Sequence, residues 1–190
     1  MAAQLLANTD AVIVGTQMSS FDTHNNQGGL TGSHANLLAR LGWSFYALRR
    51  FFSTPAYHQK NANLWSDVVV VTLSEFGRTT VQNGSNGTDH AEASVMLVGG
   101  GAVRGGVFQC GPDQGWVTGP EGSMFQVSGR YLRRSVDYRS VLGELIRDHL
   151  GASAAQLATI IPGYAQPAER LAAGGAAPDG TPIVGELGLI

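Results

Sequence analysis

The stretch Asp67-Val68-Val69-Val70-Val71-Thr72 carries the clearest fold signal in the sequence. Four consecutive β-branched apolar residues without polar alternation predict a strand that is covered on both faces, as in a parallel sheet. The strand runs directly into Leu73-Ser74-Glu75-Phe76-Gly77-Arg78, so the polar side chains of this second segment are expected just beyond the end of the strand.

A long helix is predicted between His34 and Phe52. Apolar residues recur there at spacings of three and four, which places them on one face of the helix. The members of this face are Leu37, Leu41, Phe45, Leu48 and Phe52. Ser33 is the expected N-cap because its hydroxyl can accept a hydrogen bond from the first turn.

Capping signals predict two more helices further along the chain. Asp137 is expected to cap the first of them, which should end at Gly151. Ser153 and Gln156 form a capping-box pattern before a short helix that must end by Pro162.

Further strands are expected at 11–15, 94–98 and 103–108, because each segment is a short apolar run. Gly99-Gly100-Gly101 is expected to form a tight turn between the last two. Strands that alternate with helices favour an α/β layer fold, with a mostly parallel sheet flanked by helices.

We expect one such domain over residues 1–165. The segment 166–190 is rich in Ala, Gly and Pro, and this composition predicts a loosely attached tail.

Composition and charge narrow the classes of function. Charged residues make up 14% of the 190 residues and the formal net charge is −2, so nothing points to nucleic acid. No apolar run approaches the roughly 20 residues that a membrane span needs. Residues 1–10 lack the basic and long apolar segments of an export signal. The single cysteine, Cys110, excludes a thiolate metal cluster.

Three clusters of carboxylate and imidazole side chains follow apolar runs. They are Asp22 with His24, Glu75 alone, and Asp89 with His90. Ligands of open α/β sheets collect beyond the carboxyl ends of the strands, so this placement suits a site. Carboxylates and neutral imidazoles without thiolates are typical ligands of Zn²⁺ or Mn²⁺. The clusters therefore predict a divalent-metal site.

Each cluster also has a purely structural interpretation. Asp22-Thr23-His24 is typical of an Asx-turn beside a loop histidine. Asp89 could instead cap a short helix that starts at Ala91. Arg78 either clamps an oxyanion or pairs with Glu75 or a nearby carbonyl. Sequence spacing alone leaves these alternatives open.

A serine nucleophile is a third possibility. Ser74 lies near the second cluster, and this reading requires His24 or His90 within hydrogen-bond reach of its hydroxyl. His34 and His58, at a helix start and in a polar loop, are expected to be solvated.

The order and spacing of several strings resemble the domain of unknown function 1501 family. The strings are Phe21-Asp22-Thr23-His24, Val69-Val70-Val71-Thr72-Leu73-Ser74-Glu75-Phe76-Gly77-Arg78-Thr79 and Gly87-Thr88-Asp89-His90, within a match that runs to Gly151. The resemblance implies an alkaline-phosphatase/sulfatase-like fold, found mainly in bacterial proteins. It also implies a periplasmic or extracytoplasmic location, since such proteins are commonly exported through the twin-arginine route.

The resemblance also implies roles for the candidate residues. One metal site of the superfamily corresponds here to Asp22, His24 and His90, with Asp89 beside it. Glu75 falls where relatives often have the aspartate of an Asp-His pair, and Phe76 takes the place of that histidine.

Members of the family are usually longer, with an N-terminal half that supplies a first strand and the export signal. The resemblance thus implies that this chain corresponds to their C-terminal half. A half-domain exposes sheet edge and core, so we expect a homo-oligomer or a partner chain that covers this surface.

The predicted function is that of a metal-dependent hydrolase of phosphate or sulfate esters, acting on a small anionic substrate. Glu75 would serve a second cation or act as a base, and Arg78 would meet the anion. The alternative is a non-catalytic binding or interaction module that keeps the fold without a full active site.

Overall fold

The computed structural model describes residues 1–109, 130–132, 134–178 and 180–190. The chain divides into two compact units. Unit 1 comprises Met1–Thr72, Val81–Asp89 and Leu97–Ala102, and unit 2 comprises Leu73–Thr80, His90–Met96 and Val103–Ile190.

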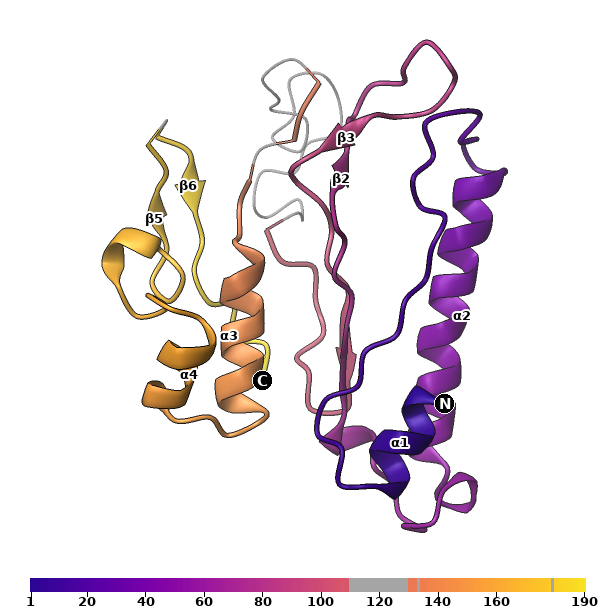
Figure 1. Ribbon diagram of the computed structural model, residues 1–190, viewed down its shortest axis with the longest axis vertical. Helices are drawn as coiled ribbons and strands as arrows, with labels where there is room; N and C mark the ends of the chain where they lie inside the picture. Colours follow the sequence, from indigo (N-terminus) through magenta and orange to yellow (C-terminus); the bar gives the residue numbers. More distant parts are fainter. Residues whose placement is uncertain (110–129, 133, 179) are drawn as a thin grey trace. The chain divides into compact units, whose positions relative to one another are not determined.

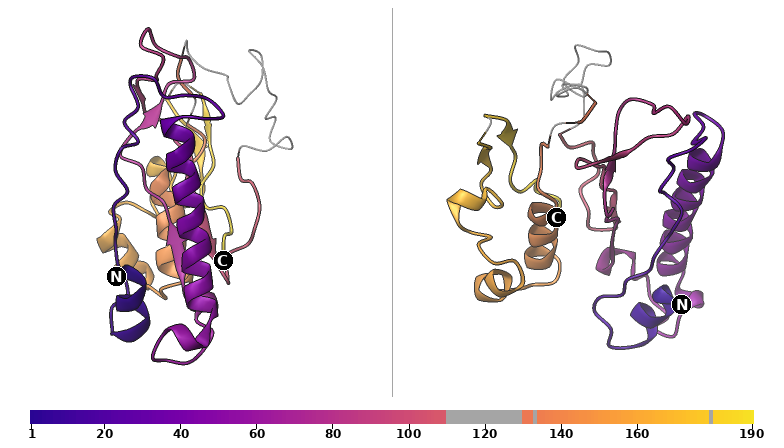
Figure 2. Two further views of the ribbon diagram at one scale, coloured as in Figure 1. Left: turned by 90° about the vertical axis from the view of Figure 1, so that its right-hand side faces the viewer. Right: turned by 45° about the horizontal axis from the view of Figure 1, so that its top comes forward.

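Unit 1 is built on one long helix and a short antiparallel strand pair (Figure 1). Its elements are α1 (Ala2–Asn8), α2 (Ser33–Ser53), β1 (Val69–Val71), β4 (Val98–Gly100) and 3-10 turns at Pro55–Tyr57 and Trp65–Asp67. Figure 2 shows α2 as one continuous rod, with α1 beside its C-terminal end. The N-cap of α2 is Gly32 and Ser33 is the first helical residue, so the helix begins one position earlier than predicted.

The apolar face predicted for α2 is confirmed. Leu37 and Phe52, at the two ends of the face, are 7% and 1% exposed. Trp43 lies outside this face and is 69% exposed. The three-and-four spacing therefore identified the side of the helix that packs inward.

The glycine run belongs to a strand and not to the predicted turn. β4 pairs antiparallel with β1, and Val70 lies opposite Gly99. A β-carbon on Gly99 would come within 3.0 Å of the Phe45 ring of α2. Glycine leaves room here for the close packing of the helix on the strand backbone.

The predicted mostly parallel sheet flanked by helices is wrong. The described residues form small two-stranded sheets, β1 with β4, β2 with β3 and β5 with β6, and each is antiparallel. A parallel pair needs a crossover connection, usually a helix. The connection 72–97 between β1 and β4 contains no helix, so the chain returns antiparallel.

Two other predicted strands are also absent. Segment 11–15 is irregular, and its Val12 and Ile13 are 69% and 75% exposed. Segment 103–108 is irregular as well. An apolar run of this length does not specify a strand unless neighbouring backbone pairs with it.

Unit 2 holds the remaining helices and the other two strand pairs (Figure 1). Its elements are β2 (Gly77–Arg78), β3 (His90–Ala91), α3 (Tyr138–Asp148), α4 (Ala154–Ile160), a 3-10 turn at Pro167–Glu169, β5 (Gly175–Ala176) and β6 (Pro182–Ile183).

The predicted capping signals of unit 2 are confirmed. The Asp137 side chain accepts a hydrogen bond from the Arg139 backbone N–H at 2.9 Å. Burial acts to raise the pKa of Asp137, but the hydrogen bonds from Arg139 outweigh it and lower this pKa. Ser153 and Gln156 form both hydrogen bonds of a capping box. Gly151, with φ of 72°, follows the end of α3.

The core of unit 2 includes part of the segment that was predicted to be a tail. Leu157, Ile161, Tyr164 and Leu171 form a buried cluster. Tyr164 packs against α3 at Gly143, where a β-carbon would collide with its ring. Burial, together with the hydrogen bond to Glu186, raises the pKa of the Tyr164 phenol.

The C-terminal residues are held to α3 by a buried carboxylate. Glu144 is 1% exposed and accepts hydrogen bonds from the backbone N–H groups of Leu187, at 2.7 Å, and Leu189. Arg147 binds Glu186 through a 2.6 Å ion pair. These contacts anchor segment 184–190 within unit 2.

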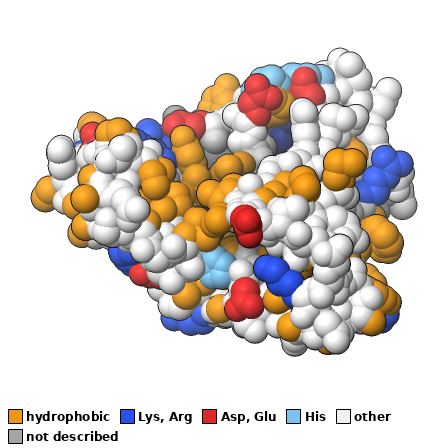
Figure 3. Space-filling model, turned by 60° about the horizontal axis from the view of Figure 1, so that its bottom comes forward, with side chains coloured by type: hydrophobic (Ala, Val, Ile, Leu, Met, Phe, Trp, Pro, Cys, Tyr) orange, Lys and Arg blue, Asp and Glu red, His pale blue; other side chains and the backbone are white. Residues whose placement is uncertain are grey.

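None of the helices formed by the described residues is both long and apolar enough to cross a membrane. Figure 3 shows hydrophobic side chains spread over one face of the surface.

His58 is buried, and the prediction that it is solvated is wrong. Its side chain packs on Phe51, with ring centroids 5.6 Å apart. Within the described part of the chain, neither ring nitrogen has a hydrogen-bond partner. Buried polar atoms without partners cost free energy.

We predict that His58→Leu stabilises unit 1 by about 1 kcal/mol, because it removes two unsatisfied nitrogens from an apolar site. The melting temperature, followed by circular dichroism, should rise. Gln59→Leu, at the exposed neighbouring position, is the control and should have little effect. A lower melting temperature for His58→Leu would contradict this prediction.

Candidate functional site

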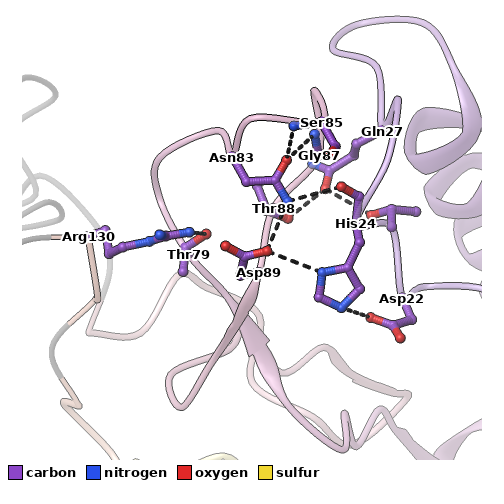
Figure 4. A network of polar contacts seen from close by, with 11 residues as sticks. Asp22, His24, Gln27, Thr79, Asn83, Ser85, Gly87, Thr88, Asp89 and Arg130 are labelled. Carbon is purple, nitrogen blue, oxygen red and sulfur yellow. Dashed lines mark hydrogen bonds and ion pairs between the residues drawn. The ribbon is translucent and has the colours of Figure 1, made fainter.

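The first predicted cluster lies in an irregular loop of unit 1. Asp22 is exposed, Thr23 is buried and His24 is partly buried. The His24 imidazole contacts a carboxylate through each of its nitrogens (Figure 4). Nε2 lies 3.0 Å from Asp22 Oδ1, and Nδ1 lies 3.2 Å from Asp89 Oδ1.

This geometry limits what the imidazole can do. A neutral imidazole donates one hydrogen bond, and only the protonated ring donates from both nitrogens. Two carboxylates can thus be held together by an imidazolium. Alternatively, one carboxylate receives the Nδ1 proton, and a metal ion lies between Nε2 and the other carboxylate.

Backbone hydrogen bonds join the His24 loop to the loop that ends at Asp89. Asn26 N–H donates to the Ser85 carbonyl at 2.9 Å, and Gln27 N–H donates to the Asn86 carbonyl at 2.8 Å. A third backbone hydrogen bond joins the same two loops, from the Thr88 N–H to the Thr23 carbonyl at 3.2 Å. Residues far apart in the sequence are therefore fixed side by side.

Asn83 connects these two loops through its side chain (Figure 4). Its Nδ2 donates to the His24 carbonyl at 3.0 Å and to Asp89 Oδ1 at 2.9 Å. Its Oδ1 accepts hydrogen bonds from Ser85 N–H at 2.9 Å and Gly87 N–H at 3.0 Å. Asn83 thus shapes its own turn and orients the Asp89 carboxylate.

Gln27 and Gly87 complete the junction. Gln27 Oε1 accepts hydrogen bonds from the hydroxyls of Thr23, at 2.8 Å, and Thr88, at 2.6 Å. A β-carbon on Gly87 would collide with the His24 backbone. The close approach of the two loops therefore requires glycine at this position.

Asn83, Gln27 and Thr88 were not identified as site residues from the sequence. The signal available was Asn83-Gly84, which is typical of a turn. A turn signal does not reveal that the asparagine amide also reaches a residue 59 positions away.

Unit 2 contains His90, Phe76 and Arg78 on the β2–β3 pair. The His90 and Phe76 rings are stacked, with centroids 3.8 Å apart and planes inclined by 15°. The Arg78 guanidinium carbon lies 4.9 Å from the centre of the Phe76 ring. Because β3 comprises His90 and Ala91, the alternative in which Asp89 caps a helix starting at Ala91 is wrong.

Glu75 and Ser74 precede β2 and are exposed. The Ser74 hydroxyl donates to the Phe76 carbonyl at 2.6 Å. That contact does not supply the base that a serine nucleophile needs.

Searches of curated proteins and of solved structures found no match. A family profile described as "Protein of unknown function (DUF1501)" matches residues 1–114. The matched segment is more than half of the chain and contains all of the predicted site residues. The chain therefore belongs to the DUF1501 family.

Proposed function

We propose that this chain binds a divalent cation, Zn²⁺ or Mn²⁺, and hydrolyses phosphate or sulfate esters. The observation that carries the proposal is the His24 imidazole, which has Asp22 at one nitrogen and Asp89 at the other. The family match supplies no activity, so the proposal rests on the donor set.

The donor set of unit 1 fits such a cation. Asp22 and His24 offer one carboxylate oxygen and one imidazole nitrogen 3.0 Å apart, and both are ligands that Zn²⁺ and Mn²⁺ accept. Metal-binding histidines usually donate their other N–H to a carboxylate. Asp89 Oδ1 lies 3.2 Å from Nδ1 and would accept that proton, and the Asn83 amide donates to the same oxygen.

Asp89 therefore has a different role in this proposal from Asp22. It holds the proton at Nδ1 of His24, which leaves Nε2 to face the cation. We propose His90, the next residue in the chain, as a third ligand. Glu75 remains a candidate for a second cation or for a base.

A bound divalent cation supplies a water of lowered pKa and polarises a phosphoryl or sulfuryl oxygen. Arg78 would bind the anionic oxygens of the ester, because its guanidinium is always charged and offers paired donors. Glu75, an exposed carboxylate next to β2, would accept the proton released in hydrolysis.

The test is metal content. Purified wild-type protein should contain near-stoichiometric zinc or manganese by inductively coupled plasma mass spectrometry. The Asp22→Ala, His24→Ala double variant should bind the metal roughly 100-fold more weakly or not at all, because both first ligands are gone. Asp10→Ala with His149→Ala is a matched control that removes the same groups elsewhere.

Hydrolysis is then assayed with p-nitrophenyl phosphate and p-nitrophenyl sulfate. Activity should follow metal content across the three proteins. A metal-free wild-type protein with an intact fold, after incubation with either cation, would refute the proposal. Equal metal content in the double variant would refute the assignment of the ligands.

A second candidate is a metal-binding module without catalysis. It is favoured by the openness of the site, since the side chains of Asp22, His24 and Asp89 are 53%, 40% and 43% exposed. Catalytic metal sites are usually dry, shaped cavities. Metal binding without hydrolysis of either ester would support this candidate.

The expected homo-oligomer or covering partner chain stays a prediction. Exposed apolar side chains such as Trp43, Tyr46 and Leu30 are compatible with it. Light scattering of the purified chain measures its mass in solution. A monomeric mass would exclude the homo-oligomer and leave the partner chain as the remaining alternative.

A further inference from the structure

The β2–β3 pair and the residue before it bring the side chains of Phe76, Arg78 and His90 together. Arg78 lies directly opposite His90 in the antiparallel register, and Gly77 lies opposite Ala91. Directly opposed residues point to the same side of a strand pair. Phe76 immediately precedes β2, and its ring contacts the side chains of both Arg78 and His90.

The Phe76 ring contacts the side chains of both His90 and Arg78. It stacks nearly parallel to the His90 imidazole at 3.8 Å, so one face of the imidazole is covered. The Arg78 guanidinium carbon lies 4.9 Å from the centre of the same ring, within the range of a cation–π interaction. A leucine at position 76 could fill the same space, but without an aromatic ring it could make neither the stacking nor the cation–π contact.

The backbone beneath this face is closely packed. Gly77 is buried, and a β-carbon there would collide with the Ala93 carbonyl. Phe76 therefore precedes a position of the strand pair at which only glycine fits. The backbone next to Phe76 is held in place by this close packing.

We propose that Phe76 is a positioning residue, which fixes the plane of the His90 imidazole and the place of the Arg78 guanidinium for an anionic ester. For metal binding, this inference rests on the proposed function. The physical reason is conformational entropy. An imidazole or guanidinium that is already ordered loses less freedom when it binds a ligand.

The first test is made without metal. In Phe76→Leu the His90 side-chain proton resonances, assigned with His90→Gln, should lose the upfield shift that an adjacent aromatic face causes. Phe76→Tyr keeps the ring and should keep the shift. Circular dichroism verifies that both variants fold, which separates positioning from a general packing role.

The second test measures zinc and manganese affinity by competition with a chelator. Phe76→Leu should weaken binding about 10-fold, as is typical of residues that orient metal ligands, and Phe76→Tyr should restore it. In the metal-free protein, a His90 resonance without an upfield shift would overturn the inference. So would equal metal affinity in Phe76→Leu and wild type.

The two proposals fail separately. If wild-type protein binds no metal but Phe76→Leu abolishes the ring-induced shift, the positioning of His90 stands and the proposed function falls. If metal binds tightly and the substitution changes neither readout, the proposed function stands and Phe76 only packs the strand pair.

Discussion

Glu144→Ala is expected to lower the free energy of unfolding of unit 2 by roughly 3 kcal/mol or more. The buried Glu144 carboxylate accepts the backbone N–H groups of Leu187 and Leu189. Alanine leaves both donors without a partner in a buried place, and each such group costs about 1–3 kcal/mol. The attachment of segment 184–190 to α3 should therefore loosen, with the Arg147–Glu186 ion pair still present.

Urea denaturation measures the loss of stability, and hydrogen exchange locates it. Amides of 184–190 should exchange faster in Glu144→Ala. Glu144→Gln keeps one acceptor oxygen and should lose about half as much stability. Glu92→Ala is the control, because Glu92 is 72% exposed in an ion pair with Arg134 and exposed pairs contribute little. Unchanged protection of 184–190 would mean that the carboxylate does not anchor the segment.

Asn83→Ala should separate the two loops of the candidate site. The asparagine side chain donates to His24 and Asp89 and accepts from Ser85 and Gly87. Removing it should destabilise unit 1 by roughly 2–3 kcal/mol. Affinity for zinc or manganese should fall 10–100-fold, because Asp89 is no longer held against the His24 imidazole.

Asn83→Asp distinguishes the two functions of the side chain. A carboxylate still accepts from Ser85 and Gly87, so the turn should form. It cannot donate to Asp89, and it would place a second negative charge near a carboxylate that is now 2.9 Å away. Both variants should bind metal weakly, but Asn83→Asp should be the more stable in denaturation. Metal affinity equal to wild type in either variant would exclude Asn83 from the site.

Local features of the fold were predictable from the sequence. The face of α2 that includes Leu37 and Phe52 follows from helical periodicity within one segment. The Asp137 cap and the Ser153–Gln156 capping box depend on residues at most three apart. Such signals do not need knowledge of the rest of the chain.

The direction of strand pairing was not predictable in this way. The run of valines before Thr72 identified β1 correctly, but a β-branched run reports a pleated, partly buried surface and not the direction of its partner. Gly99 was interpreted as a turn residue. In the sequence, a strand glycine that accommodates Phe45 cannot be distinguished from a turn glycine.

The candidate site was predicted only in part, for a related reason. Asp22, His24 and Asp89 were identified from residue type alone, because carboxylates and imidazoles are recognisable as candidate metal ligands in any loop. The contact of His24 with Asp89 spans 65 positions. Asn83, which holds that contact, resembles an ordinary turn residue until the two loops are seen together.

The anchoring of Leu187 and Leu189 on Glu144 also has a consequence for the order of folding during synthesis. Unit 1 draws its residues from 1–102, so all of its parts leave the ribosome before residues 187–189. Unit 2 cannot satisfy its buried carboxylate until residues 187–189 have emerged. Any α3 that forms on the ribosome before then has Glu144 without these two donors, so unit 2 completes its core only late in its own synthesis.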